Sequence, residues 1–122
     1  MRKRSIAECA SSNSANGTPV QVYTCNGTGA QQWTYVEAGS TLHALGKCLD
    51  IPGGATADGT KLQIWDCNNT AAQVFIHRSD NTYYNPQSNK CLDDPGFTNQ
   101  AGTQVQIWDC NGTGAQHWVL QS

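Results

Sequence analysis

Charged side chains are scarce in this chain of 122 residues, and no long apolar run occurs in it. Only 13% of the residues are charged, and three of the seven basic ones are Arg2, Lys3 and Arg4. Nucleic-acid binding needs a clustered basic face, and a membrane-spanning helix needs about 20 consecutive apolar residues. We therefore expect neither a nucleic-acid partner nor membrane insertion.

Motifs typical of metal, cofactor and catalytic sites are missing as well. No two cysteines have the short Cys-x-x-Cys spacing of a zinc site, and His43, His77 and His117 are scattered along the chain. The chain has neither a Gly-rich phosphate loop nor a recognisable set of Ser, His and Asp. We expect no metal, no cofactor and no catalysis by this chain alone.

Cysteine, in contrast, is abundant. The chain has six cysteines, an even number that in so short a chain indicates a disulfide framework. Such frameworks form in oxidising compartments, so we expect the protein to be secreted. Residues 1–4 resemble the charged start of a signal peptide, but no apolar run follows them. We expect a mature or excised piece whose first residues are not native.

One sequence pattern occurs three times. The segment 61–75 recurs at 104–118, an offset of 43 residues, and an earlier copy at 19–33 is offset by 42. The tetrapeptide Lys-Cys-Leu-Asp of 47–50 returns at 90–93. Self-similarity at a fixed period indicates a repeat architecture.

The repeated segments have the periodicity of β-strands. Apolar Leu62 and Ile64 alternate with Gln63 and Trp65, as expected for a strand with one face in the core. Gly, Asn, Asp and Thr turn signals separate such runs, and no segment has a helical period. We predict an all-β chain with about four strands in each repeat and about twelve in all. The strands of one repeat unit are predicted at 47–51, 61–66, 74–78 and 83–85.

Three short motifs carry a resemblance to a known family. They are Cys-Leu-Asp at 48–50 and 91–93, Gln-Ile-Trp-Asp-Cys at 63–67 and 106–110, and Gln-x-Trp or Gln-x-Phe at 31–33, 73–75 and 116–118. The chain resembles the ricin-B-type β-trefoil lectins and the family 13 carbohydrate-binding modules. The resemblance implies a β-trefoil of three pseudo-symmetric four-stranded repeats in one domain over residues 1–122. The repeats would span about 1–39, 40–81 and 82–122.

Two pairs of cysteines have the same separation of 19 residues and fall on neighbouring strands of one repeat. We predict both as disulfides within their repeats: Cys48 with Cys67, and Cys91 with Cys110. Cys9 and Cys25 remain as the third pair. The first repeat is irregular, because the position equivalent to Cys48 is Ile6 and that equivalent to Asp50 is Glu8.

A sugar site needs an aromatic platform for the apolar face of the ring and a few fixed polar groups for its hydroxyls. By resemblance, each repeat supplies a carboxylate, an amide and an aromatic ring. These are Asp50, Gln63 and Trp65 in the second repeat, Asp93, Gln106 and Trp108 in the third, and Gln21 and Tyr23 in the first, with Glu8 as its candidate carboxylate. The alternatives are core packing for the tryptophans and a turn role for Asp50 and Asp93, which precede Pro52 and Pro95.

Other repeated residues receive structural roles. Trp33, Phe75 and Trp118 are predicted to lie in the core. The glutamines that precede them, Gln31, Gln73 and Gln116, are predicted to hold the backbone where each repeat closes, and in the family they also support the site. Asp66 and Asp109 are predicted to be solvated. The Asn-x-Thr triplets at 26–28, 68–70 and 111–113 are predicted to share a turn geometry.

The resemblance implies a non-catalytic, carbohydrate-binding module that is a monomer or part of a larger secreted enzyme. Many relatives have Asn just before the Gln of Gln-x-Trp, where this chain has Ala30, Ala72 and Ala115. The sugar is therefore left open among galactosides, xylan and other polysaccharides. A glycosidase needs two carboxylates across one bond, and Asp50 and Asp93 belong to different repeats. The alternative function is a protein-interaction or inhibitor β-trefoil.

Overall fold

The computed structural model describes residues 5–9, 14–24, 33–97 and 102–118, which form short strands joined by turns and single-turn 3₁₀ helices. This confirms the all-β class. Within those ranges the strands are β1 (Ser5–Cys9), β2 (Val20–Thr24), β3 (Thr34–Val36), β4 (Thr41–Ala44), β5 (Lys47–Asp50), β6 (Gln63–Trp65), β7 (Ile76–His77), β8 (Tyr83–Asn85), β9 (Lys90–Asp93), β10 (Thr103–Gln104) and β11 (Gln106–Asp109).

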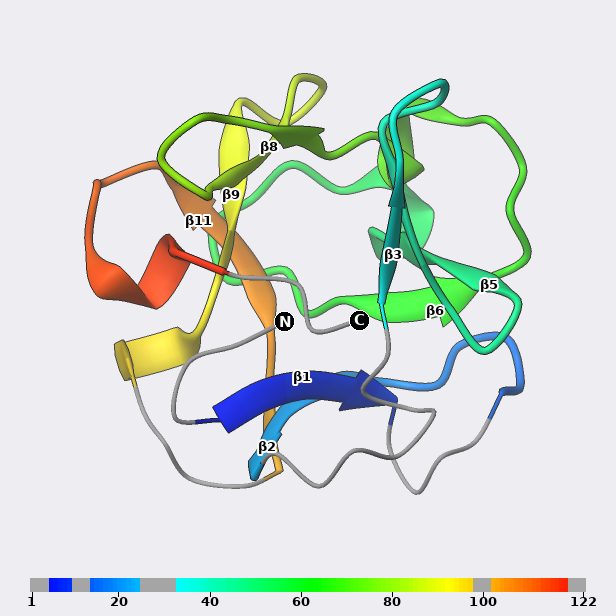
Figure 1. Ribbon diagram of the computed structural model, residues 1–122, viewed down its shortest axis with the longest axis horizontal. Helices are drawn as coiled ribbons and strands as arrows, with labels where there is room; N and C mark the ends of the chain where they lie inside the picture. Colours follow the sequence, from blue (N-terminus) through cyan, green and yellow to red (C-terminus); the bar gives the residue numbers. More distant parts are fainter. Residues whose placement is uncertain (1–4, 10–13, 25–32, 98–101, 119–122) are drawn as a thin grey trace.

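The strands form three antiparallel sheets. Their orders are β1-β2-β10, β3-β4-β5-β6 and β11-β9-β8-β7. In Figure 1 the sheets occupy three sides of the molecule, with β1 and β2 at the bottom, β3, β5 and β6 on the right, and β8, β9 and β11 on the upper left. Each sheet forms one sector of the fold and combines strands of neighbouring repeats. β3 of the first repeat pairs with β4, β7 of the second repeat pairs with β8, and β10 of the third repeat pairs with β2.

The core is built from equivalent residues of the three repeats. The central residues of the repeated strands are fully buried, which follows from their alternation with polar neighbours. They are Val20, Leu62 and Val105, followed two residues later by Val22, Ile64 and Ile107. The aromatic residues that end each copy, Trp33, Phe75 and Trp118, are buried as predicted. One apolar cluster thus joins all three sectors.

Backbone hydrogen bonds tie the three repeats into a closed cycle. The amide of Val20 donates to the carbonyl of Leu62 at 3.2 Å, that of Leu62 to Val105 at 3.0 Å, and that of Val105 to Val20 at 2.9 Å. Each of these residues donates to one neighbouring repeat and accepts from the other. The cycle satisfies buried backbone groups that lie between the sheets.

Two predicted strands are shorter than the sequence pattern suggests. The strand predicted at 74–78 is reduced to β7, because the amide of Val74 closes the 3₁₀ helix Ala71–Gln73 by donating to Ala71. The strand predicted at 61–66 is reduced to β6, because Leu62 gives its amide to the inter-repeat cycle. A 3₁₀ turn in the first case and an inter-repeat hydrogen bond in the second therefore replace part of the regular pairing.

Tyr83 lies in this core beside Tyr35 and His77, whose rings are 5.7 and 4.8 Å from its own. Burial, and secondarily the charge of Tyr35, raises the pKa of Tyr83 to about 12. The unfolded chain releases this proton near pH 10, so the stabilisation is present below pH 10 and is lost as the pH rises to about 12. We expect the free energy of unfolding to fall in that window. The free energy of unfolding of the Tyr83→Phe variant, measured by urea unfolding at pH 9 and pH 11, should fall less between the two pH values than that of the wild type. An equal decline in both proteins would contradict the role of Tyr83.

Candidate functional site

Two cavities of similar size lie at equivalent positions in the second and third repeats, with volumes of about 510 and 480 Å³. They contain the predicted carboxylate, amide and aromatic set of their repeat. The first is lined by Asp50, Gln63, Trp65, Asn68, Thr70, Ala72 and Gln87, together with the Pro52–Gly54 turn. The second is lined by Asp93, Gln106, Trp108, Phe97, Asn111, Thr113 and Ala115. We call them the second-repeat pocket and the third-repeat pocket.

The carboxylate of the second-repeat pocket is held by two amides. Asp50 is 6% exposed at the end of β5, and Gln63 is its register partner on β6. Gln63 Nε2 donates to Asp50 Oδ2 at 2.8 Å, and Gln73 Nε2 donates to Oδ1 at 3.2 Å. Each carboxylate oxygen keeps a second lone pair for a ligand hydroxyl. Asp50 is the last residue of β5, and its side chain accepts these hydrogen bonds from two glutamines, while the turn itself is formed by Pro52–Gly54.

Gln73 also holds the backbone, as predicted. It is fully buried, accepts a hydrogen bond from the amide of Asn68 at 3.0 Å, and donates to the carbonyl of Asp66 at 2.9 Å. The same side chain therefore fixes the loop after β6 and the orientation of Asp50. Gln31, the equivalent residue of the first repeat, lies outside the described residues.

The third-repeat pocket repeats this arrangement with one addition. Gln116 Nε2 donates to Asp93 at 3.0 Å and to the carbonyl of Asp109 at 2.9 Å, while Gln106 Nε2 is 3.5 Å from Asp93. Lys61 Nζ donates to Gln106 Oε1 at 2.8 Å. In the second repeat the equivalent bridge position is held by Pro19, which has no side-chain donor. The third-repeat pocket therefore has a cation at its amide.

The tryptophans of both pockets present an open ring face. Trp65 and Trp108 are 39% and 41% exposed, which confirms that they lie on the face opposite the core. Each ring rests against a glycine of the preceding repeat. A Cβ atom placed on Gly17 would lie 3.8 Å from Trp65 Cζ3, and one on Gly59 would lie 3.7 Å from Trp108 Cζ3. Both glycines have a left-handed φ, of +88° and +86°, so a larger residue there would strain the backbone.

In the first repeat the backbone register pairs the carboxylate and amide positions in the same way as in the other two repeats. Glu8 is the partner of Gln21, as Asp50 is of Gln63, and Ile6 is the partner of Tyr23. Glu8 thus occupies the carboxylate position. The side chains of Glu8 and Tyr23 lie outside the described part of the structure, so a third pocket stays a prediction.

The register of β1 also places Ile6, and not Cys9, at the position of Cys48. Cys9 is the partner of Val20. Cys25 lies outside the described residues, and its pairing with Cys9 stays a prediction.

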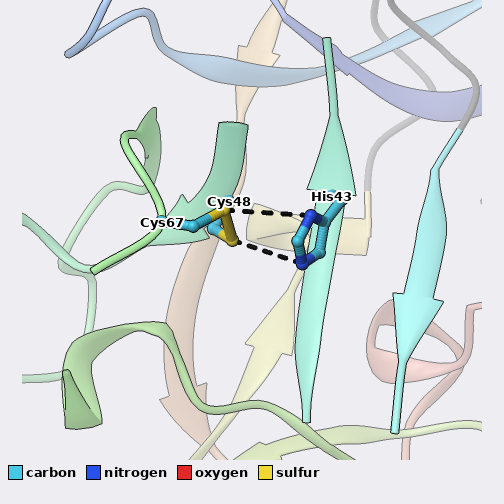
Figure 2. Close-up of side chains that lie close together, drawn as sticks. All are labelled: His43, Cys48 and Cys67. Carbon is cyan, nitrogen blue, oxygen red and sulfur yellow. Dashed lines mark hydrogen bonds between the residues drawn. A yellow bond between two sulfur atoms is a disulfide. The ribbon is translucent and has the colours of Figure 1, made fainter. Parts of the chain in front are cut away.

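Both disulfides with a separation of 19 residues are present, Cys48–Cys67 and Cys91–Cys110, with Cα atoms 5.1 Å apart in each. Figure 2 shows the imidazole of His43 facing the first of them, with Nε2 at 3.4 Å from Cys48 Sγ and Nδ1 at 3.8 Å from Cys67 Sγ. His43, Cys48 and Cys67 would suit a metal only if both cysteines were thiolates. Because the two sulfurs are bonded to each other, this group is a disulfide with a neighbouring imidazole.

Asp66 and Asp109 are exposed, as predicted, and they also form ion pairs. Lys47 Nζ lies 3.6 Å from Asp66, and Lys90 Nζ lies 3.0 Å from Asp109 and 3.4 Å from Asp58. The hydrogen bond with Asp109 raises the pKa of Lys90, and the same bond lowers the pKa of Asp109. Neither Asp66 nor Asp109 lines a pocket. Their role is to connect strands at the surface.

Sequence reasoning missed several lining residues. Gln87 reaches the second-repeat pocket from the turn between β8 and β9, which belongs to the next repeat, and no sequence signal connects the two. The Asn-x-Thr triplets could have been found from the sequence, because they recur at equivalent positions, of which 26–28 lies outside the described residues. Their shared turn is present: Asn68 Oδ1 accepts from the amide and hydroxyl of Thr70, and Asn111 does the same for Thr113. Both triplets contribute side chains to the pockets.

Within the described ranges, no helix has the length and apolar character needed to cross a membrane. The fold of three repeats, each with a Gln-x-Trp or Gln-x-Phe closure, defines a β-trefoil lectin-type domain. The sequence matches the ricin-type β-trefoil lectin domain over residues 1–121, and the chain belongs to that family. Domains of this family are non-catalytic carbohydrate-binding folds.

Solved structures share the fold at low sequence identity. Agglutinin from Abrus precatorius superposes with a TM-score of 0.85 at 23% identity, over 98% of this chain and 45% of that one. An exo-β-1,3-galactanase from Clostridium thermocellum gives 0.82 at 24% identity, over 93% of this chain and 27% of the enzyme. The C-terminal half of an earthworm R-type lectin, in complex with GalNAc, gives 0.76 at 16% identity, over 94% and 88% of the chains. The chain thus spans less than half of the agglutinin, and no curated protein sequence matches it.

Proposed function

We propose that this domain binds carbohydrate through the second-repeat and third-repeat pockets, with one sugar ring stacked on each tryptophan. The observation that carries the proposal is the duplication of one complete constellation. A buried carboxylate held by two amides lies beside a half-open tryptophan in both pockets. Contact with a single protein partner would not require the same set in two repeats.

The chemistry of each pocket suits a sugar ring. The exposed face of Trp65 would pack against the C–H face of the ring, and Asp50 would accept hydrogen bonds from two adjacent hydroxyls. The Oε1 atom of Gln63 provides a further acceptor. Since Gln63 and Gln73 already fix the carboxylate, little side-chain entropy remains to be lost on binding.

Galactose-type sugars are the first ligands to test. The relatives of similar fold include a protein in complex with GalNAc and an enzyme named for its action on β-1,3-galactan. Ala72 and Ala115 line the two pockets where many relatives have Asn, so a polar contact is missing and xylose-based ligands are tested in parallel.

Several weak sites gain affinity when they bind one polymer together, because the second contact becomes intramolecular. A domain of this kind would target a larger secreted hydrolase or toxin to polysaccharide or glycan. Two described disulfides in a chain of 122 residues support an extracellular location.

The proposal is tested by calorimetric titration with methyl galactoside, GalNAc and xylobiose, after a glycan array has ranked them. The double variant Asp50→Asn, Asp93→Asn should bind about 10- to 100-fold more weakly, because it loses the charged acceptor in each pocket. The matched control Asp66→Asn, Asp109→Asn changes the exposed carboxylates of the same repeats and should bind like the wild type. An array without any bound glycan would overturn the proposal in favour of a protein partner.

A further inference from the structure

The two pockets differ at one wall. The residue four positions after the pocket carboxylate is Gly54 in the second repeat and Phe97 in the third. Phe97 is 58% exposed and lines the same cavity as Trp108. The third-repeat pocket therefore has two aromatic side chains, whereas the second has one.

A matching change in the neighbouring 3₁₀ helix makes room for the phenyl ring. A Cβ atom placed on Gly114 would lie 2.8 Å from Phe97 Cζ, closer than real Cβ contacts allow, so the ring rests directly on this glycine. The equivalent residue of the second repeat is Ala71, opposite Gly54. The second repeat thus pairs Gly54 with Ala71, whereas the third pairs Phe97 with Gly114, and the missing side chain of Gly114 leaves space for the phenyl ring.

Phe97 also keeps a backbone conformation that costs free energy. Its φ is +50°, a left-handed value that is unfavourable for a bulky L-residue. Gly54 has the same conformation, with φ +65°, and as glycine it has no such cost. A strained, exposed aromatic residue in a ligand pocket is evidence of a binding role rather than of a folding role.

The corresponding space of the second-repeat pocket is polar. The amide of Gln87 approaches Gly54, with Oε1 and Nε2 at 3.7 and 3.8 Å from the position of a Cβ atom there. A ligand that extends past the tryptophan therefore meets an amide in the second repeat and an apolar ring in the third.

We infer that the third-repeat pocket takes a saccharide of at least two residues, with the first sugar on Trp108 and the apolar face of the next one on Phe97. The second-repeat pocket offers the next sugar the amide of Gln87 in place of an aromatic ring. This inference rests on the proposed carbohydrate-binding function. It makes Phe97 a specificity-determining residue that the sequence motifs of the family do not include.

The test isolates each pocket and compares ligands that differ by one sugar. In the Trp65→Ala background, which leaves the third-repeat pocket, Phe97→Gly should weaken β-1,3-galactobiose about five- to tenfold and leave methyl galactoside within about twofold. Methyl xyloside and xylobiose serve as the pair if the wild type prefers xylose. In the Trp108→Ala background, which leaves the second-repeat pocket, Phe97→Gly should change neither ligand.

Gly114→Ala provides a second route to the same result. The added methyl group displaces the ring, so it should reduce disaccharide affinity with Phe97 present and have no further effect on the Phe97→Gly protein. Thermal unfolding of Phe97→Gly should occur at the wild-type temperature or above, because the backbone strain is relieved.

Equal losses for the monosaccharide and the disaccharide, or no loss for either, would overturn the role of Phe97 while leaving the proposed function intact. A glycan array on which the wild-type protein binds no glycan would overturn both.

Discussion

Trp65→Ala combined with Trp108→Ala is expected to lower the affinity for every bound saccharide by at least about 30-fold, while the protein stays folded. Loss of the platform removes about 2 kcal/mol of stacking contact from each pocket. Both rings lie outside the apolar cluster that joins the repeats. Truncating them therefore removes ligand contacts and leaves the core in place.

Each single variant should remove one class of site and keep the other, so the calorimetric stoichiometry falls without complete loss of binding. Ile76→Ala is the matched control, because Ile76 is 40% exposed, similar to both tryptophans, and lines neither pocket. Wild-type affinity in the double variant would show that the sugar binds elsewhere.

Replacement of Cys91 and Cys110 by Ser is expected to reduce the free energy of unfolding by about 3 kcal/mol and the melting temperature by about 10 °C. The disulfide closes a loop with a sequence separation of 19 residues. It also connects β9, which ends at Asp93, to the chain just after β11, which contains Trp108. The pocket should therefore weaken along with the fold.

The same pair of substitutions at Cys48 and Cys67 is the internal comparison, because this disulfide has the same separation. Differential scanning calorimetry of both variants measures the two losses under one condition. His43 is the register partner of Cys48, and Tyr84 is that of Cys91, so the local surroundings differ only in part. Two variants that melt with the wild type would show that the crosslinks contribute nothing to stability.

Much of the fold and of each pocket could be predicted because the sequence repeats. Alternation alone separates Trp65 from its neighbours Leu62 and Ile64, and the structure places the ring outside and the aliphatic side chains inside. The recurrence of Asp, Gln and Trp at fixed offsets predicts that the three lie together in each repeat, and the structure places them around one pocket in the second and third repeats. Periodicity indicates which face of a strand a residue occupies, and this was sufficient to predict the buried and exposed positions.

Contacts between repeats could not be predicted in this way. Gln87 lines a pocket of another repeat, and Gly17 and Gly59 lie next to the tryptophan of the repeat that follows them. No spacing within a repeat reveals these neighbours. No sequence motif connects His43 with a cysteine, yet the pairing of β4 with β5 places it beside the Cys48–Cys67 disulfide. Phe97 packs on Gly114 because the 3₁₀ helices Pro95–Phe97 and Gly114–Gln116 contact each other, and the sequence alone does not reveal this contact.

The hydrogen-bonded cycle of Val20, Leu62 and Val105 arranges the three repeats of one chain as a head-to-tail ring, like the subunits of a cyclic oligomer. Every repeat offers one surface to its predecessor and a different one to its successor, and the ring closes because the last repeat meets the first. Trp65 resting on Gly17 and Trp108 resting on Gly59 show that the pockets belong to these junctions. Deleting one repeat would therefore break two junctions at once, so the pockets and the closure of the fold depend on the same contacts.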